Sequence, residues 1–157
     1  MSSDPKRDLL RHSVATLAYR GGKAVRDASP DFAAFAGAGR TPAQILAHIG
    51  DLLDWALSMA EGKQRWQDSK SLPWDQEIER FFAGLKAFDD FLASPNPLAA
   101  PAERLFQGPI ADGLTHVGQI AMMRRLAGDP IKGENYFLAE VAAGRVGPDQ
   151  AAPKRQF

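Results

Sequence analysis

The sequence of 157 residues contains no cysteine, which excludes disulfide bonds, thiolate metal ligands and a cysteine nucleophile. It also lacks an excess of either charge, because 19 lysine and arginine residues balance 19 aspartate and glutamate residues. This balance gives no electrostatic reason to expect nucleic acid or an anionic membrane as a partner. No apolar run approaches the roughly 20 residues that span a bilayer, and the first residues lack the apolar block of a signal peptide. We therefore expect a cytoplasmic protein.

The chain has no internal repeat and no alternating strand pattern of useful length, and its size suits one domain with one core. Glycine and proline divide it into helical segments. We expect one domain over residues 1–157 with an all-α fold, an up-down four-helix bundle followed by a short C-terminal helix and a tail. Gly21 and Gly22 could bend the first helix. The expected helices run from Pro5 into the twenties, from 42 to about 60, from 75 to about 93, from 109 to about 127 and from 134 to about 143.

The second of these helices has the clearest boundaries. Thr41 is a suitable N-cap, Pro42 suits the first helical position, and Gln44 completes a capping box. The helix should stop near Gly62. Its apolar arc is formed by Ile45, Leu46, Ile49, Leu52, Leu53 and Ala56, and the opposite face, expected to point towards water, carries Asp51, Asp54 and Ser58.

The fourth helix is expected to have two covered faces. On a helical wheel, one side collects Ile110, Leu114, Val117 and Ala121. The nearly opposite side collects Gln119, Met123 and Leu126 together with Asp112 and His116. One face should meet the bundle core, and the other should meet either the C-terminal segment or a second subunit.

Three side chains form a candidate metal site. Asp112 and His116 are four residues apart, so they lie one turn apart on one face of a helix. His48 lies at the edge of the apolar arc of the second helix and could complete a site of two histidines and one carboxylate. Such a site suits zinc, nickel, iron or manganese and leaves positions open for water or substrate. Alternatively, His48 is a hydrogen-bonded core histidine, and the helix dipole favours Asp112 in a first turn.

Other residues near this constellation have alternative roles. Gln119 could orient a metal ligand or hydrogen-bond across the bundle, and Asp51 is a weak candidate for a partner of His48. His12 lies away from the apolar stripe of its helix and is expected in solvent. Trp55 and Tyr136 could line a pocket near the metal. The aromatic residues expected in the core are Phe81, Phe82 and Phe88, and those that could close one end of the bundle are Tyr136 and Phe137.

Several segments resemble the DinB-like (YfiT-like) metalloenzyme family. The run from His116 to Gly128 contains the pattern H-x-G-Q and ends in a Leu-Gly-like stop, as the last bundle helix of that family does. The run from Thr41 to Ile49 looks like the family's helix that supplies the first histidine. The segments 133–137 and 144–147 are also similar. The resemblance covers most of the chain from the second helix onward.

This resemblance implies a four-helix bundle with a divalent metal ion held by three residues. It places His48 at the first ligand position and His116 at the third. Asp112 stands where the family usually has a second histidine, and a carboxylate is a harder ligand that removes one positive charge from the site. The resemblance also implies a class of reaction, because characterised relatives include S-transferases and isomerases that use low-molecular-weight thiols, although many members have no known reaction.

We therefore expect a metal-dependent enzyme, either a thiol-dependent S-transferase or a hydrolase, with the metal ion held by His48, Asp112 and His116. No catalytic general base is evident in the sequence, so the ligand at the open metal position would itself be the nucleophile. A homodimer and a small-molecule or thiol substrate are the expected partners. The alternative is a non-catalytic helical domain that dimerises or binds a small ligand, with a degenerate metal site.

Overall fold

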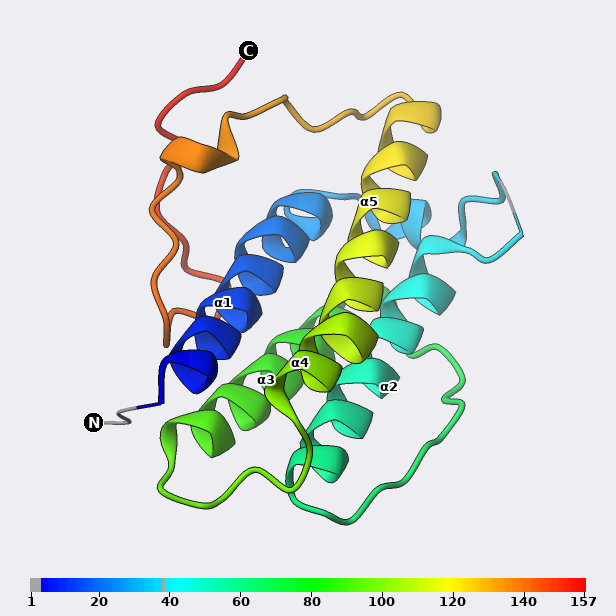
Figure 1. The fold of residues 1–157 in the computed structure, drawn as a ribbon. Helices are drawn as coiled ribbons and strands as arrows, with labels where there is room; N and C mark the ends of the chain where they lie inside the picture. Colours follow the sequence, from blue (N-terminus) through cyan, green and yellow to red (C-terminus); the bar gives the residue numbers. More distant parts are fainter. Residues whose placement is uncertain (1–3, 38) are drawn as a thin grey trace.

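A computed structural model describes residues 4–37 and 39–157. Four long helical segments form a bundle, and the C-terminal segment runs beside the first of them (Figure 1). No β-strand occurs in the described ranges, which contain a single isolated bridge between Glu134 and Gln156. The all-α bundle predicted from the sequence is confirmed. Its elements are α1 (Pro5–Val25), η1 (Pro30–Ala34), α2 (Pro42–Ala60), α3 (Trp74–Ala93), α4 (Ala102–Leu105), η2 (Phe106–Ile110), α5 (Ala111–Leu126) and η3 (Tyr136–Leu138).

Helix α2 begins and ends as the sequence predicts. The Thr41 side chain accepts a hydrogen bond from the Gln44 backbone, and the Gln44 side chain accepts one from the Thr41 backbone, which completes the capping box. After the helix, Gly62 adopts a φ of 76°, a value that favours glycine. The polar face is different from the expectation, because Asp51 and Ser58 are buried rather than turned to water.

The fourth helical segment is longer than the sequence predicts. It begins at Ala102 and passes through a π-helical turn, η2, before it continues as α5. Pro109 lies inside this π-turn rather than at a helix start. Proline has no backbone N–H to donate and crowds the preceding turn, and the wider turn accommodates it within the helix. Asp112 therefore lies in the first α-helical turn after the π-turn.

The helix directions depart from simple alternation. Along α2 and α3, the Arg80 guanidinium donates to the carbonyl of Ala47, and Leu53 lies against Gly84. Later residues of α2 thus contact later residues of α3, so the two helices are parallel. The connection 61–73 makes this possible, because it runs back along the outside of the bundle from the end of α2 to the start of α3 (Figure 1).

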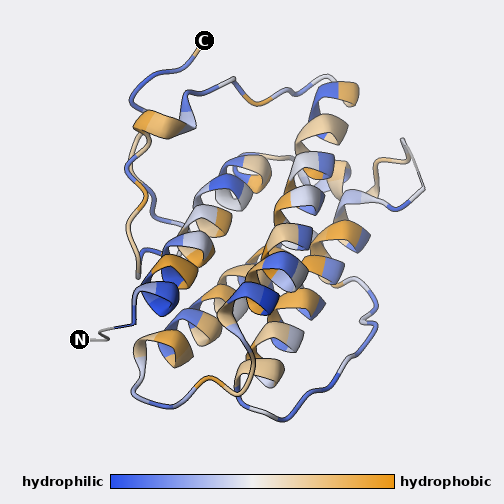
Figure 2. Cartoon of the chain, in the orientation of Figure 1, coloured by the Kyte–Doolittle hydropathy of each residue, from blue (hydrophilic) through white to orange (hydrophobic). Residues whose placement is uncertain are grey.

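Helix α5 and α2 are antiparallel, whereas α5 and α1 run parallel. Gly113 of α5 lies against Leu17 of α1, and Gly21 lies near Val117. The core between the four segments is apolar, and the long connection 61–73 is hydrophilic (Figure 2). Phe81 and Phe88 lie fully inside this core, and Phe82 is half-buried against it. Helix α1 continues through Gly21 and Gly22 to Val25 rather than breaking there.

The C-terminal segment docks on α1 through buried polar contacts. The Tyr19 hydroxyl donates to Glu134 at 2.5 Å, and the Lys23 ammonium donates to the other Glu134 oxygen at 2.8 Å. Tyr136 packs edge-on against Tyr19. The C-terminal helix expected over about 134–143 is only the short turn η3, because these side-chain contacts hold the chain in an extended path. Phe137 does not close the bundle, since its side chain is 94% exposed.

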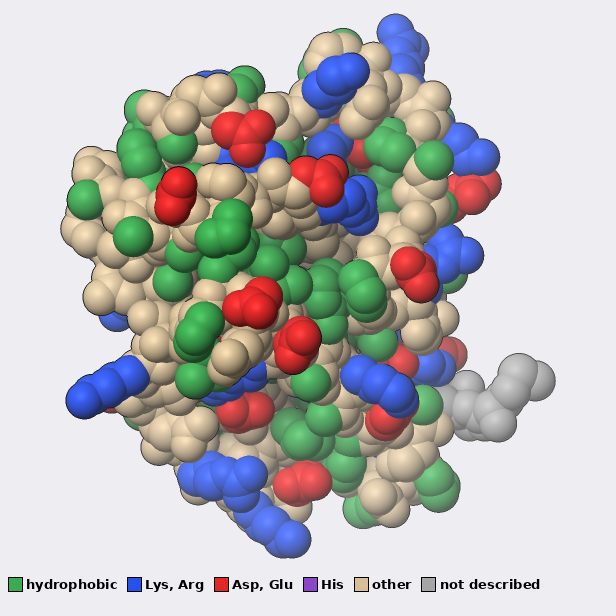
Figure 3. All heavy atoms as spheres, turned by 180° about the vertical axis from the view of Figure 1, so that it is seen from behind, with side chains coloured by type: hydrophobic (Ala, Val, Ile, Leu, Met, Phe, Trp, Pro, Cys, Tyr) green, Lys and Arg blue, Asp and Glu red, His purple; other side chains and the backbone are tan. Residues whose placement is uncertain are grey.

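The second face of α5 is only partly covered. Met123 is buried in the core, but Leu126 remains 60% exposed. None of the helices in the described ranges combines the length and apolar character needed to cross a membrane. On the face opposite to that of Figure 1, charged side chains of both signs are interspersed with apolar ones, which matches the balanced composition (Figure 3).

Candidate metal centre

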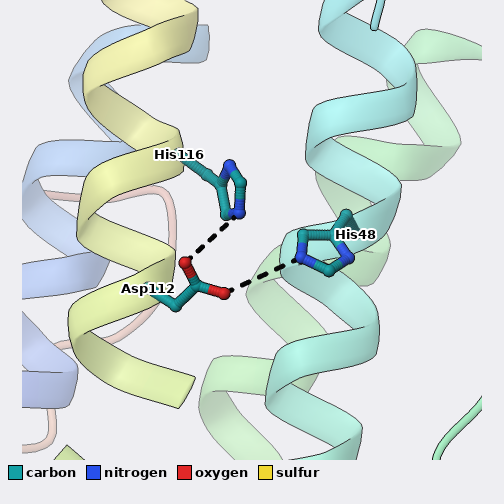
Figure 4. A group of neighbouring side chains, drawn as sticks. All are labelled: His48, Asp112 and His116. Carbon is teal, nitrogen blue, oxygen red and sulfur yellow. Dashed lines mark ion pairs between the residues drawn. The ribbon is translucent and has the colours of Figure 1, made fainter. Parts of the chain in front are cut away.

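The fold brings the three predicted ligands together at the surface between α2 and α5. His48 comes from the second turn of α2, and Asp112 and His116 come from successive turns of α5 (Figure 4). The antiparallel packing of the two helices sets this position, and Ile49, the residue after His48, lies beside Gly113, the residue after Asp112. All three side chains point toward the same region (Figure 4).

The distances suit one shared cation. Asp112 Oδ1 lies 3.4 Å from His116 Nε2, and Asp112 Oδ2 lies 3.8 Å from His48 Nε2. One ligand atom from each residue lies within 4.8 Å of the other two. Bonds of about 2.1 Å to a common ion allow ligand atoms to be up to about 4.2 Å apart. Both Asp112 distances therefore fit a shared ion.

The site is open on one side. The side chain of Asp112 is 47% exposed, whereas those of His48 and His116 are 20% and 14% exposed. The two imidazole rings meet edge to face, with centroids 4.7 Å apart. The two histidine side chains are therefore mostly shielded from solvent, and the carboxylate of Asp112 is exposed to it. An ion held by these three residues would have further coordination positions on this side.

Gln119 orients one of the histidines. Its Oε1 lies 2.7 Å from His116 Nδ1 and accepts a hydrogen bond from that nitrogen. A proton on Nδ1 leaves the Nε2 lone pair free and directed at Asp112 and His48. This contact lies within α5 and is made to a predicted ligand, so it is not a hydrogen bond across the bundle.

The environment of His48 favours its neutral form, which is the form that binds metal. Burial lowers the pKa of this imidazole below its ordinary value, and electrostatic interactions with the neighbouring His116 and Arg40 lower it further. No side-chain hydrogen bond orients His48 among the residues that the structure describes. Its ring is held instead by edge contacts with His116 and with Trp66, whose ring centroid lies 5.7 Å away.

Trp66 belongs to the connection 61–73, which is anchored beside the site. Asp51 accepts hydrogen bonds from the backbone and the hydroxyl of Ser69, and it forms an ion pair with Arg80 at 2.6 Å. These contacts explain why Asp51 is buried. They also show that Asp51 holds the connection and α3 rather than acting as the hydrogen-bond partner of His48 that the sequence suggested.

Two further expectations have clear outcomes. His12 is exposed, as predicted, and lies outside the three-residue group. Trp55 packs against Trp66 on the same side as His48, with ring centroids 5.8 Å apart. Tyr136 instead packs against α1, where the Arg20 guanidinium lies 3.6 Å from its ring centroid. It therefore lies with the C-terminal segment and contributes nothing to a pocket beside His48.

Two hollows adjoin the histidines and share Arg40, a residue that sequence reasoning missed. The first has a volume of about 440 Å³ and is lined by residues of α2 and the connection, including Gln44, His48 and Lys70. The second, of about 560 Å³, lies between α2 and α5 beside His116. Arg40 precedes Thr41, the N-cap of α2, so helical spacing gives no signal for it. Trp66 has no such signal either, because it lies in an irregular connection.

Comparisons with known proteins identify no relative of this chain. No family model matches the chain, and neither a curated protein nor a solved structure matches it. The geometry of the site is therefore the main basis for a functional proposal.

Proposed function

We propose that this chain binds one divalent metal ion through His48, Asp112 and His116 and acts as a metal-dependent enzyme. The observation that carries the proposal is the convergence of these three side chains from two helices on one sheltered point. The hydrogen bond of Gln119 to His116 adds support, because bound histidines in metal sites ordinarily donate their second ring N–H to a neighbouring acceptor.

The ligand set favours some metals over others. Two neutral imidazoles and one carboxylate carry a single negative charge, which attracts a divalent cation. Nitrogen and hard oxygen donors together suit zinc, iron(II) or manganese, and the carboxylate reduces the preference for nickel relative to an all-histidine site. The absence of cysteine removes soft thiolate ligands.

The reaction class that we propose is thiol-dependent S-transfer or hydrolysis. A divalent cation held here would lower the pKa of a coordinated thiol or water and thereby supply a nucleophile near neutral pH. The half-exposed Asp112 side leaves room for such a small molecule to enter. The resemblance of the H-x-G-Q segment to DinB-like proteins favours a low-molecular-weight thiol, and a cytoplasmic location stays a prediction.

A second candidate is a non-catalytic helical domain that forms homodimers or binds a small ligand. The exposed Met122 and Leu126 near the end of α5 favour it, because large apolar side chains in adjacent turns make a surface suited to association. In this case the histidines would serve packing, and replacing them would alter stability without changing metal content.

Elemental analysis of protein prepared without an affinity tag tests the proposal. The protein is incubated with zinc, iron(II) or manganese, freed of excess metal and analysed alongside His48→Ala and His116→Ala. The exposed His12→Ala is the matched control, because it removes the third histidine of the chain outside the site. We expect about one equivalent of metal in the parent protein and in the control, and a loss in both site variants.

Two results would overturn the proposal. One is a parent protein that retains less than about a tenth of an equivalent of every metal supplied. The other is an unchanged metal content in His116→Ala with native helical content by circular dichroism. Either would leave the non-catalytic candidate as the better account of the bundle.

A further inference from the structure

The hollow between α2 and α5 has a size and lining suited to a small organic molecule. Its volume of about 560 Å³ lies within the range of small-molecule pockets, roughly 300–1,000 Å³. His116 and Gln119 form one part of its wall, so the hollow borders one of the three residues of the candidate metal centre. Its apolar part is formed by Ile45, Met122, Met123 and Leu126.

The apolar wall contains side chains that the bundle leaves uncovered. Met122 and Leu126 are both more than half exposed, although Met123 and Ile45 beside them are buried in the core. An apolar ligand lying against these two side chains would remove their surface from water, which is favourable. Methionine adapts readily to ligands of different shape.

Arg40 gives the hollow a positive charge at its border. Its guanidinium forms no ion pair or side-chain hydrogen bond with any residue that the structure describes. Other arginines of the bundle are satisfied, as Arg11 is by Asp89 and Arg124 by Asp129. Because Arg40 borders the second hollow as well, its charge lies between the two openings that reach the histidines.

We propose that the substrate of this site is a small organic anion with an apolar body. Its apolar body lies against Met122 and Leu126, and its anionic group pairs with Arg40. A guanidinium binds carboxylates and related oxyanions through paired hydrogen bonds. The proposal rests on the proposed function, since it places the reacting end of the substrate beside His116. Arg40 and the apolar wall act as specificity-determining residues.

Isothermal titration calorimetry tests the proposal with two probes that differ in charge. Phenylbutyrate carries an apolar ring and a carboxylate, and phenylbutanol replaces the carboxylate with a neutral hydroxyl. Both are titrated into the full chain, with and without one equivalent of zinc. We expect phenylbutyrate to bind at least about tenfold more tightly than phenylbutanol.

Two arginine variants distinguish the effect of the Arg40 charge from the effect of lowering the net charge of the protein. Arg40→Gln should weaken phenylbutyrate binding about tenfold, to the level of phenylbutanol. Arg104→Gln is the matched control, because Arg104 is exposed on α4 and lies outside both hollows. It should leave the affinity unchanged. Leu126→Ser should weaken both probes, since it removes apolar wall rather than charge.

Equal affinities for the two probes, no effect of Arg40→Gln, or no binding of phenylbutyrate would each overturn the proposal. A dimer in light scattering that Leu126→Ser converts to a monomer would also overturn it, because a second copy would then cover the hollow. Metal content is measured in the same samples. Zinc retention without phenylbutyrate binding rejects only the substrate inference, whereas Arg40-dependent phenylbutyrate binding without zinc retention supports the anion site and rejects the metal proposal.

Discussion

The two adjacent glycines of α1 provide a sharp test of how the bundle packs. Gly21 faces the fully buried Phe81, and a Cβ at this position would lie 2.5 Å from Phe81 Cζ and 3.0 Å from Cε1. Gly22 faces the half-buried Phe82, and a Cβ there would lie 3.5 Å from the nearest ring atom. The first distance is a clash, and the second is an ordinary van der Waals contact.

Replacement by alanine should therefore have opposite effects at the two positions. Alanine in a helix interior is favoured over glycine by about 1 kcal/mol. At Gly21, overpacking costs up to about 3 kcal/mol, since Phe81 is enclosed and has no space to move, so the net destabilisation is about 2 kcal/mol. At Gly22 the propensity gain remains, and Gly22→Ala should stabilise the protein by about 0.5–1 kcal/mol.

Urea unfolding followed by circular dichroism measures both effects. The variants should differ by about 3 kcal/mol in the free energy of unfolding, and their midpoints should differ by about 1 M or more. A third variant, Phe81→Leu, shortens the opposing ring, and it should cost less in the Gly21→Ala background than in the parent chain. Shifts of the same sign for both alanine variants, or additive effects of Gly21→Ala and Phe81→Leu, would refute this packing.

Further predictions concern the polar contacts of the bundle. Burial raises the pKa of Asp51, but hydrogen bonds from Ser69 and Arg80 outweigh burial and leave this pKa below its ordinary value. The stabilisation from the ionised Asp51 is fully present above about pH 3.9, the pKa of an unfolded aspartate, and is lost as the pH falls through the lowered folded-state pKa. Asp51→Asn removes this carboxylate. The free energy of unfolding, measured by urea titration at successive pH values, should therefore fall less steeply at acid pH in this variant. Glu134→Ala leaves the half-buried Lys23 and the buried Tyr19 without their shared acceptor and should lower the unfolding free energy by about 3 kcal/mol. Glu134→Gln should be milder in the same urea assay. Thr41→Ala removes the side-chain acceptor of the α2 capping box and should cost about 1 kcal/mol in thermal unfolding; an unchanged midpoint would show that the cap contributes nothing.

The parts of the fold that the sequence predicts are those governed by local interactions. The capping box at Thr41 and the positive-φ glycine at Gly62 act within a few residues, so both ends of α2 could be predicted. The pairing of Asp112 with His116 is equally local, because helix periodicity alone places them on one face. Pro109 misled the same reasoning, since a π-turn admits a proline within a helix.

The parts that could not be predicted depend on contacts between distant segments. The burial of Asp51 results from Ser69 and Arg80, which lie on the connection and on α3. A helical wheel shows only the positions of residues within one helix and does not include partners from other segments. A carboxylate on its polar face is therefore expected to be exposed to water. The parallel direction of α2 and α3 likewise depends on the path of residues 61–73, where no periodic pattern exists to constrain it.

The same distinction explains how the candidate site arises from one local and one tertiary condition. Asp112 and His116 are brought together by helix geometry alone and would be neighbours in any helix. His48 joins them only because α2 packs antiparallel against α5, which places it beside Asp112 and His116. The connection 61–73 then adds Trp66 beside His48, and its anchor at Asp51 lies one turn of α2 away. The position of His48 relative to α5 thus depends on helix packing, and its contact with Trp66 depends on the path of the connection.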